Sequence, residues 1–487
     1  MLCRLLGMLL IIMSVSMLLP VGVSLLYGDG AQFGLVLSAL LSLMLGLLLR
    51  RFLGAGAPTQ LHEREGVFYT VIIWLVVPLM GALPYLFTST VTTFADAAFE
   101  SFSGYTTTGS SVLHDIDSLP QGLLVWRSTS QWVGGMGLIL FVVALLQKLN
   151  EGSARLYESE FSGTLQRRLH PRLSRSVMLM WAVYLALTVL MFVSLLLVGN
   201  GLVDSLCTAM STVSTGGFMT HDAGFAGFTP LTVSIVTLFM FLSGTNLAVL
   251  YYFFTGRWSQ LFSRRADGRP VIDEEFVRYV VLFLFAVVIT TVSLSRGGLT
   301  LATLRTSLFH VASTISTCGF IASTTEEWPL ALSVLTFLLM IVGASSGSTG
   351  GGIKIKRLMI VARSVRNYFD QIIHPQAVVS VKVDGKAVGE DYVRRVYVFI
   401  FLYLAFAMAG AFVYTLCDMS IADALCVAVA NISNLGPSPI LNGMGTGLDY
   451  AALPLAAKWC TMALMLAGRL EIYAFIAVFM PAFWKRR

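Results

Sequence analysis

The chain has little charge. Only 12% of its 487 residues are Asp, Glu, Lys or Arg, and 56% are hydrophobic, whereas a soluble domain carries about 25% charged residues. Several apolar runs reach the length of about 20 residues that a helix needs to cross a bilayer. The composition therefore excludes an ordinary soluble domain, and we expect a polytopic membrane protein.

Cysteine and histidine are scarce as well. The six cysteines are scattered without a CxxC pair, and the six histidines form no HExxH motif. This pattern predicts neither a disulfide framework nor a metal site. His310 lies near Ser313, but no oriented acid accompanies the two residues. An intramembrane enzyme is therefore disfavoured, and we expect the chain not to be an enzyme.

The formal net charge of +6 is distributed unevenly. Under the topology below, 27 of the 32 Lys and Arg residues fall on one side: Arg4, Arg50, Arg51, Arg64, those within 148–175, 257–278 and 354–395, and the last three residues. Basic residues gather in cytoplasmic loops, so we expect both termini to be cytoplasmic and no nucleic-acid partner. The first apolar run, Leu5–Leu26, is longer than a signal-peptide core and is read as a retained helix.

Ten apolar spans are predicted, an even number that agrees with two cytoplasmic ends. They cover residues 5–26, 33–49, 67–88, 122–147, 176–198, 229–254, 277–295, 329–363, 393–416 and 450–484. Shorter segments, too brief to cross a membrane, lie between some of them.

These short segments contain an internal repeat. MSTVSTGGFMT begins at Met210 and ASTISTCGFIA at Ala312, and related turns occur in TTTGS and SNLGP. Aligned on their glycines, they have a residue suited to cap a helix thirteen positions earlier. The glycines are Gly109, Gly217, Gly319 and Gly436, and the expected N-caps are Asp96, Asp204, Thr306 and Asp423.

The repeat predicts the fold class. We expect an all-α membrane protein in which two N-terminal helices precede four units of span, short pore helix, turn and span around one central ion pore. The predicted regions are 1–53 for the two extra helices, then 54–160, 161–262, 263–375 and 376–487 for the four pore repeats.

The turns have the composition of an ion-coordinating backbone. Irregular backbone at membrane depth is tolerated where it lines a polar path, and rings of carbonyl oxygens can replace the water around a potassium ion. The C-terminal ends of the short helices would add partial negative charge. The expected potassium-binding residues are Thr106, Thr107, Thr108, Gly109, Ser214, Thr215, Gly216, Gly217, Ser316, Thr317, Cys318, Gly319, Ser433, Asn434, Leu435 and Gly436.

Acidic residues follow each turn on the expected outer side. They could concentrate cations at the pore mouth, or they could be ordinary solvated loop residues; the sequence leaves both interpretations open. They are Asp115, Asp117, Asp222, Glu326, Glu327 and Asp449.

The second span of the third repeat is interrupted by a run rich in glycine and serine, Gly343–Gly352. Such a run does not sustain a helix, because each glycine costs about 1 kcal/mol relative to alanine. It lacks the spacing of a phosphate-binding loop. We expect a gating segment beneath the turns, with glycine-mediated packing at a helix end as the alternative. Its residues include Gly343, Ser345, Ser346, Gly347, Ser348, Thr349, Gly350, Gly351 and Gly352, and Lys354, Lys356 and Arg357 are expected to anchor it at the cytoplasmic face.

Arg469 lies deep in the last span, in MLAGRLEIYAF. A charged residue inside the membrane is a functional candidate by default. We expect it to face the pore beside the gating segment and to raise the barrier for cations. A structural pair with Glu471 or with carbonyl groups is the alternative.

With these motifs in place, the chain resembles the Trk/Ktr/HKT superfamily of potassium uptake proteins, and in particular the bacterial TrkH/TrkG type with its two extra N-terminal helices. The resemblance covers essentially the whole chain. It implies selectivity for potassium over sodium, because all four filter positions are glycine, and it implies permeability to rubidium. Asn434 and Pro437 make the fourth turn depart from the other three.

The resemblance also implies partners and location. The expected partners are a TrkA-like cytoplasmic subunit with nucleotide-binding Rossmann-type domains, a second copy of the chain in a homodimer, and membrane lipid. The expected location is the bacterial inner membrane, and potassium ion is the expected ligand, with no organic cofactor. A sodium-permeable protein, or a symporter coupled to protons or sodium, remains an alternative.

Overall fold

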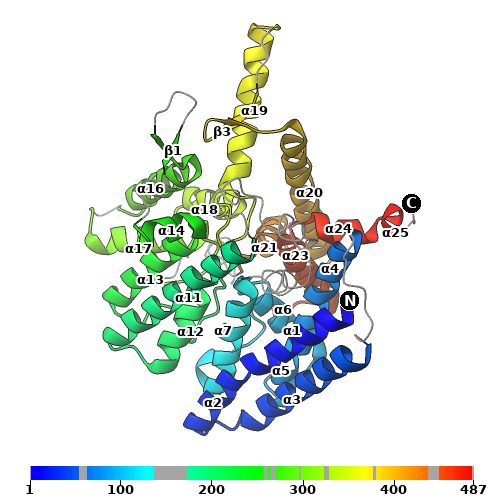
Figure 1. The fold of residues 1–487 in the computed structure, drawn as a ribbon. Helices are drawn as coiled ribbons and strands as arrows, with labels where there is room; N and C mark the ends of the chain where they lie inside the picture. The colour runs from blue at the N-terminus through cyan, green and yellow to red at the C-terminus, as the bar shows by residue number, and fades with distance from the viewer. Residues whose placement is uncertain are drawn as a thin grey trace.

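The computed structural model describes residues 2–53, 63–136, 173–256, 262–264, 270–295, 298–322, 328–376, 380–436 and 449–484. The described chain is helical apart from two short two-stranded antiparallel hairpins (Figure 1). The fold class predicted from the sequence is confirmed: two N-terminal helical spans precede four units that each contain a short helix between longer ones.

The N-terminal part packs as a close helix pair. It comprises α1 (Leu2–Ser16), α2 (Leu18–Tyr27), α3 (Gln32–Leu48) and the π-helical turn η1 (Leu49–Leu53). A Cβ on Gly7 would lie 2.6 Å from the Gly46 carbonyl oxygen, so glycine permits the two backbones to meet. Small residues allow such close crossing of membrane helices.

Four units follow. The first contains α4 (Glu63–Gly81), α5 (Leu83–Phe87), α6 (Phe94–Tyr105), η2 (Ile116–Ser118) and α7 (Gln121–Gly135). The second contains α11 (Leu173–Leu197), α12 (Leu202–Val213), α13 (Pro230–Ser243) and α14 (Leu247–Phe254). The third contains β1 (Phe262–Arg264), β2 (Pro270–Ile272), α16 (Glu274–Leu294), α17 (Leu301–Ile315), α18 (Leu330–Val342) and α19 (Ile355–Ile373). The fourth contains β3 (Lys382–Val383), β4 (Lys386–Ala387), α20 (Glu390–Thr415), α21 (Ile421–Ile432), α23 (Leu455–Arg469), α24 (Tyr473–Phe479) and α25 (Pro481–Trp484).

The four units close into a ring. The inner helix of each unit packs against the short helix of the next, in the pairs α7 with α12, α13 with α17, and α18 with α21. The last inner helix, α23, packs against α6 of the first unit. The short helices α6, α12, α17 and α21 are therefore held around one axis.

The expected N-caps of the short helices were wrong. Thr93 and Ser420 cap α6 and α21, and each accepts a hydrogen bond from the backbone N–H three residues on, which belongs to Asp96 or Asp423. The two aspartates thus lie in the first turn, where their negative charge interacts favourably with the positive end of the helix dipole. Gly201 precedes α12, and Thr300 caps α17, which begins well before Thr306.

The spans are more broken than predicted. Six described helices are long and apolar enough to cross a membrane, and counting two bent pairs as spans gives eight. The predicted continuous spans 229–254 and 450–484 were wrong, because α13 and α14 meet at 109° and α23 and α24 at 116°. Residues 137–147 of another predicted span lie outside the described residues. The span 329–363 is interrupted, as expected, between α18 and α19.

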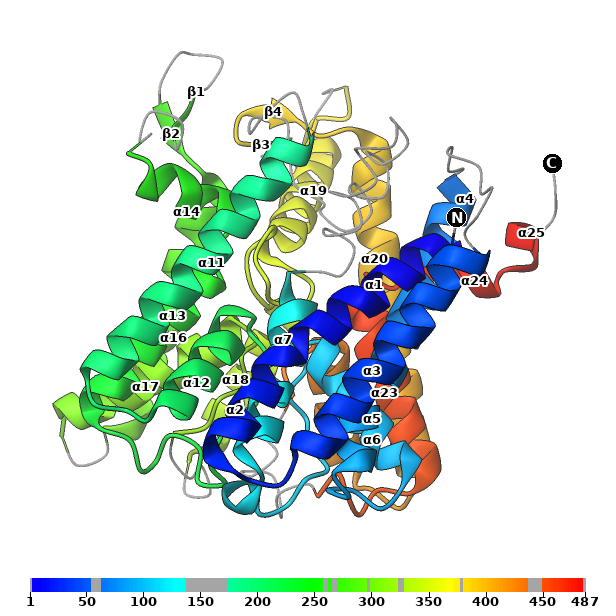
Figure 2. The same cartoon turned by 60° about the horizontal axis from the view of Figure 1, so that its bottom comes forward.

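The surface is consistent with a lipid environment. Large apolar side chains are exposed along α3, α11, α16 and α20, including Phe33, Leu185, Phe285 and Phe401. The start of α1 and the helix α25 lie toward the end of the bundle that carries the two hairpins (Figure 2). The division into five residue ranges stays a prediction.

Candidate functional site

The four turns share one hydrogen-bonding pattern. Each short helix ends four residues before its glycine, at Tyr105, Val213, Ile315 or Ile432. In every turn, the residue two before the glycine donates its N–H to the carbonyl three residues back, and the next residue donates to the carbonyl five residues back. These amides therefore bond to the short helix and not to the carbonyl oxygens of the turn.

The backbone conformation repeats as well. The four glycines have φ between +75° and +86°, and the residues two positions earlier have φ between +52° and +60°. These earlier residues are Thr107, Thr215, Thr317 and Asn434. Left-handed angles are costly for residues with a Cβ, so finding them at the same position four times indicates a backbone that the surrounding structure imposes.

The turns contact one another around the axis. A Cβ on Gly109 would lie 2.3 Å from the Gly216 carbonyl oxygen, and one on Gly217 would lie 2.2 Å from that of Cys318. A Cβ on Gly436 would lie 2.1 Å from the carbonyl oxygen of Thr108. The structure therefore brings together the predicted residues from all four turns, and glycine is required where the loops meet.

Several hydroxyl groups of the turns form hydrogen bonds with supporting groups. Thr106, Ser214 and Ser316 donate their hydroxyl protons to carbonyls of their own short helices. Ser433 shares a 2.6 Å hydrogen bond with Tyr403 Oη. These side chains fasten the turns to their supports, and backbone carbonyls are the more suitable ligands for an ion.

Two amide side chains brace individual turns. Gln131 Nε2, on α7, donates to the Gly216 carbonyl at 2.6 Å, and a Cβ on Gly216 would clash with this amide. Asn434 Nδ2 donates to Thr108 Oγ1 at 3.1 Å and to the Met465 carbonyl at 2.9 Å. Asn434, which stands where the other turns have threonine, thus bonds the fourth turn to the first turn and to α23.

A buried ion pair stands behind the first two turns and was missed from the sequence. Arg127 Nε lies 2.9 Å from Glu100 Oε1, and both side chains are almost fully buried. Arg127 also donates to Ser111 Oγ and the Met219 carbonyl. Removing one partner of a buried pair costs about 3–5 kcal/mol, so this pair rigidly joins the segments that follow two turns.

The segment Gly343–Gly352 lies directly beneath the turns. Gly351 N donates to Thr317 Oγ1 at 2.8 Å, and a Cβ on Gly351 would lie 1.9 Å from the Ser433 carbonyl oxygen. At its base, Ile353 N and Lys354 N donate to the carbonyls of Ile341 and Val342. The segment is therefore a stemmed loop whose far part contacts the turns, and we call it the intramembrane segment.

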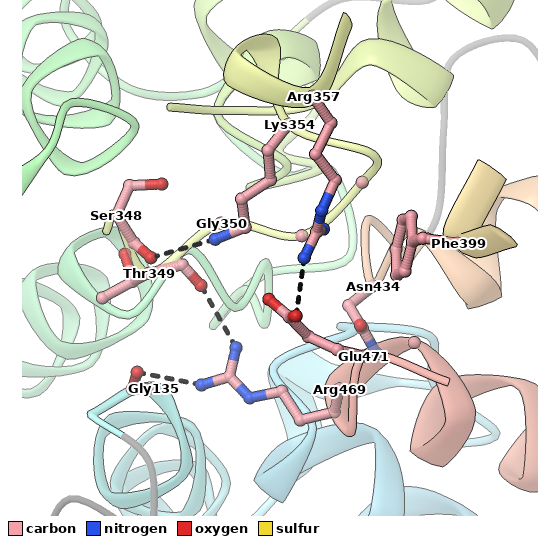
Figure 3. Close-up of a pocket in the computed structure, with 13 residues that line it drawn as sticks. Gly135, Ser348, Thr349, Gly350, Lys354, Arg357, Phe399, Asn434, Arg469 and Glu471 are labelled. Carbon is pink, nitrogen blue, oxygen red and sulfur yellow. Dashed lines mark hydrogen bonds and ion pairs between the residues drawn. The ribbon is translucent and has the colours of Figure 1, made fainter. Parts of the chain in front are cut away.

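Arg469 contacts this segment. Its Nη1 donates to the Thr349 carbonyl at 3.2 Å, and its Nη2 donates to the carbonyls of Gly134 and Gly135 at 2.7 and 2.9 Å. Figure 3 shows the guanidinium of Arg469 pointing from α23 toward Thr349 and Gly135. Arg469 therefore lies beside the segment, as expected, and it also has carbonyl partners, as the alternative proposed.

A second basic residue faces the same cavity. Arg357 Nη2 lies 2.6 Å from Glu471 Oε2, and its guanidinium packs over the Phe399 ring at 3.9 Å (Figure 3). Lys356 and Arg357 are each only 4% exposed, so both side chains lie within the protein, and the expectation that they anchor the segment at the cytoplasmic face stays a prediction. The cavity is lined by Gly135, Ser348, Thr349, Gly350, Gly351, Gly352, Lys354, Arg357, Phe399, Asn434, Gly468, Arg469 and Glu471.

Glycines at the other inner-helix ends were also missed. A Cβ on Gly134 would lie 1.9 Å from the Tyr105 carbonyl oxygen, and one on Gly468 would lie 2.1 Å from that of Ile432. A Cβ on Gly244 would lie 3.1 Å from Ser316 Cβ. These glycines lie in the motifs VGGMG, LSGTN and LAGRL, each about 25–32 residues after a turn glycine. This spacing could have predicted a close contact between each inner-helix end and a short helix or turn.

The acidic residues outside the turns are partly interlocked. Asp117 Oδ1 lies 2.5 Å from His221 Nδ1, and Asp222 accepts from Ile116 N at 3.1 Å. The hydrogen bond from His221, followed by that from the backbone of Asp222, lowers the pKa of Asp117. Asp449 lies 3.4 Å from His114 Nε2. These acids join neighbouring units, while Glu326 and Glu327 lie outside the described residues.

His310, the residue considered for enzyme-like chemistry, is bonded to a threonine hydroxyl and packs against an aromatic ring. His310 Nε2 makes a 2.8 Å hydrogen bond with Thr336 Oγ1, and its ring packs against Trp328. No group of three His, Cys, Asp or Glu residues suited to a metal ion occurs in the part of the chain that the structure describes.

Comparisons with known proteins agree on one family. The family model "TrkH: Cation transport protein" matches residues 47–486. The chain is 34% identical to the Trk system potassium uptake protein TrkH of Salmonella typhimurium, with 99% of this chain and 98% of the relative covered. It is 32% identical to the Trk system potassium uptake protein TrkG of Escherichia coli, with 98% and 97% covered.

The crystal structure of the potassium transporter TrkH from Vibrio parahaemolyticus has the same fold. It superposes with a TM-score of 0.84 at 30% sequence identity, and the match covers 99% of each chain.

Proposed function

Because the chain belongs to the TrkH family of cation transport proteins, we propose that it carries potassium across the bacterial inner membrane for uptake. Its similarity to Trk system potassium uptake proteins over almost the whole chain supports this function. The observation that carries the proposal at the level of residues is the four-fold repeat of the turn backbone, with left-handed angles at the same two positions in each turn.

The four turns act as the selectivity filter in this proposal. Carbonyl oxygens of residues 106–109, 214–217, 316–319 and 433–436 take the place of the water around a dehydrated potassium ion. Rubidium, which is close to potassium in size, passes as well. The C-terminal ends of four short helices face the same region and favour a cation.

The intramembrane segment and Arg469 form the gate. The segment lies beneath the turns and contacts Thr317, and Arg469 adds a positive charge that opposes a cation. A TrkA-like cytoplasmic subunit that binds nucleotides would regulate the gate. The chain would act as a homodimer in lipid, with one pore per protomer and both termini cytoplasmic.

Rubidium uptake into liposomes that contain the purified chain tests the proposal. Uptake that potassium blocks and sodium does not is expected. Equal competition by both ions would favour the sodium-permeable alternative, and dependence on a proton or sodium gradient would favour coupled symport. If the chain alone is closed, addition of the cytoplasmic subunit should start uptake, and its failure to do so would contradict the proposal.

A further inference from the structure

A buried carboxylate holds the intramembrane segment from a side that none of the preceding functional assignments uses. Glu275 lies in the first turn of α16 and is only 6% exposed. Its Oε1 accepts a hydrogen bond from the backbone N–H of Ser346 at 2.5 Å. A bond between an N–H and a charged carboxylate is about twice as strong as a neutral one.

The other contacts of this part of the segment are mostly neutral. Ser345 N donates to the Gly244 carbonyl at 3.0 Å, and the Gly347 carbonyl accepts from Leu247 N at 3.1 Å. Both bonds are made to the break between α13 and α14. Glu275 therefore supplies a carboxylate contact to the segment at Ser346, and Arg469 supplies a separate contact at the Thr349 carbonyl.

Glu275 also stands at the end of a network that reaches the cytoplasmic hairpin. Its neighbour Glu274 pairs with Arg363 of α19, and Glu274 N donates to Asp384 Oδ1 at 3.1 Å. Asp384 lies in the turn of the β3–β4 hairpin. The buried Lys356 ammonium interacts electrostatically with Glu275, Asp384 and Asp273.

We propose that Glu275 is a positioning residue through which α19 and the β3–β4 hairpin hold the intramembrane segment beneath the turns. The inference rests on the proposed gating function of this segment. A protein that binds the hairpin would shift Asp384 and α19, weaken the contact between Glu275 and Ser346, and release the segment. The route runs from the cytoplasmic surface to the pore without passing through the filter.

Three variants of the full chain in liposomes test this inference. Glu275→Asp keeps the charge and withdraws the carboxylate by one carbon–carbon bond, whereas Glu275→Gln keeps an oxygen acceptor at full length. Glu390→Gln is the control, because Glu390 occupies the first turn of α20, the equivalent helix of the fourth unit, and is exposed.

The expected result is a gain in transport. Glu275→Asp should raise basal rubidium uptake and amide hydrogen exchange within residues 343–352 by about tenfold, the effect of losing one bond to a charged group. Glu275→Gln should give a smaller increase, and the control should give none. The ratio of rubidium to sodium uptake should stay unchanged, and a merely destabilised fold would lower uptake instead.

Unchanged exchange in residues 343–352 of Glu275→Asp would overturn the inference, as would a shifted rubidium-to-sodium ratio. Hydrogen exchange does not depend on transport, so the two proposals fail separately. Faster exchange in a chain that never carries rubidium would keep the role of Glu275 and contradict the transport function. Normal rubidium transport with unchanged exchange would keep the transport function and contradict the role of Glu275.

Discussion

The four turns form an upper layer and the four inner-helix ends form a lower layer. The internal repeat is regular in the upper layer and irregular in the lower one. The turns share their hydrogen bonds and their left-handed angles, even where Asn434 replaces threonine. Below them, one inner end carries a ten-residue segment and another carries Arg469, while a third is a sharp bend at Gly244–Asn246. Coordination of an ion needs oxygens on every side, whereas a single obstruction closes a path. The comparison fits the proposed function, in which all four units act on the ion together only at the turns and a single unit supplies the obstruction.

Shortening the intramembrane segment, the main irregular feature of the lower layer, should have the largest effect on basal rubidium uptake. Deletion of residues 345–351 keeps the stem between Ile341–Val342 and Ile353–Lys354 and removes the contact of Gly351 with Thr317 and the bond of Ser346 to Glu275. Basal rubidium uptake should rise by at least about tenfold, since the lost contacts include a bond to a charged group. Liposome flux measures this.

The matched control keeps the length of the segment. Ser345→Ala with Ser346→Ala retains the backbone N–H groups that donate to Gly244 and Glu275, so uptake should stay near that of the unaltered chain. Loss of uptake in a well-folded deletion variant would show that the segment is structural and would contradict a gating role.

Breaking the symmetry of the upper layer should change selectivity instead of basal flux. In Gly109→Ser, the new Cβ would lie 2.3 Å from the Gly216 carbonyl oxygen, at a φ of +86°. We expect the preference for potassium over sodium to fall by about tenfold, because displaced carbonyls no longer match the dehydrated ion. Competition of the two ions for rubidium uptake reports the ratio.

Gly199→Ser is the control for this substitution. Gly199 has a φ of +94° with open space around its Cβ position, so this variant carries the backbone strain without touching a turn. Equal ratios in the two variants would argue that strain alone, and not the filter, caused the change.

Neutralising Arg469 should have an intermediate effect. Arg469→Ala leaves the carbonyls of Thr349, Gly134 and Gly135 without this donor and removes a positive charge beneath the turns. Basal uptake should rise by about three- to tenfold, since the barrier to a cation falls. The exposed Arg366 on α19 offers a control, as Arg366→Ala removes the same charge elsewhere. Identical leak in both variants would contradict the local role of Arg469.

Making the fourth turn like the other three should have the smallest effect. Asn434→Thr loses the bonds to Thr108 and Met465, and the protein should lose about 2 kcal/mol of stability, with each bond contributing about 1 kcal/mol. A thermal melt in detergent measures this loss. Ion selectivity should hardly change, because threonine has the same backbone in three turns. A large shift in selectivity would show that Asn434 itself contacts the ion.

Much of the upper layer could be predicted from local sequence. The turns recur with glycine at fixed spacing, and a short helix between apolar spans has few other places to go in a membrane. The caps could not be assigned as well, because aspartate is favourable both as an N-cap and in the first turn. Thr93 and Ser420 proved to be the caps, and Asp96 and Asp423 followed in the first turn.

The lower layer was harder to predict. The bend at Gly244–Asn246 occurs within an apolar run that reads as a continuous span, and it lies where Gly244 meets Ser316 of the next turn. The ion pair of Arg127 could not be predicted from the sequence, because its partner Glu100 lies 27 positions away on another helix. Such pairs depend on packing, which no local pattern records.

The sequence by itself determined the membrane class, the two extra helices and the four-fold repeat, because hydrophobic length and glycine spacing are local properties of the chain. Only the tertiary structure decided how the ring closes, with α23 against α6, and which carbonyls meet at its centre. It also decided that Arg469, Glu275 and Thr317 all contact one intramembrane segment. These contacts join residues far apart in the chain, and their energies arise only when burial excludes water from the groups they bring together.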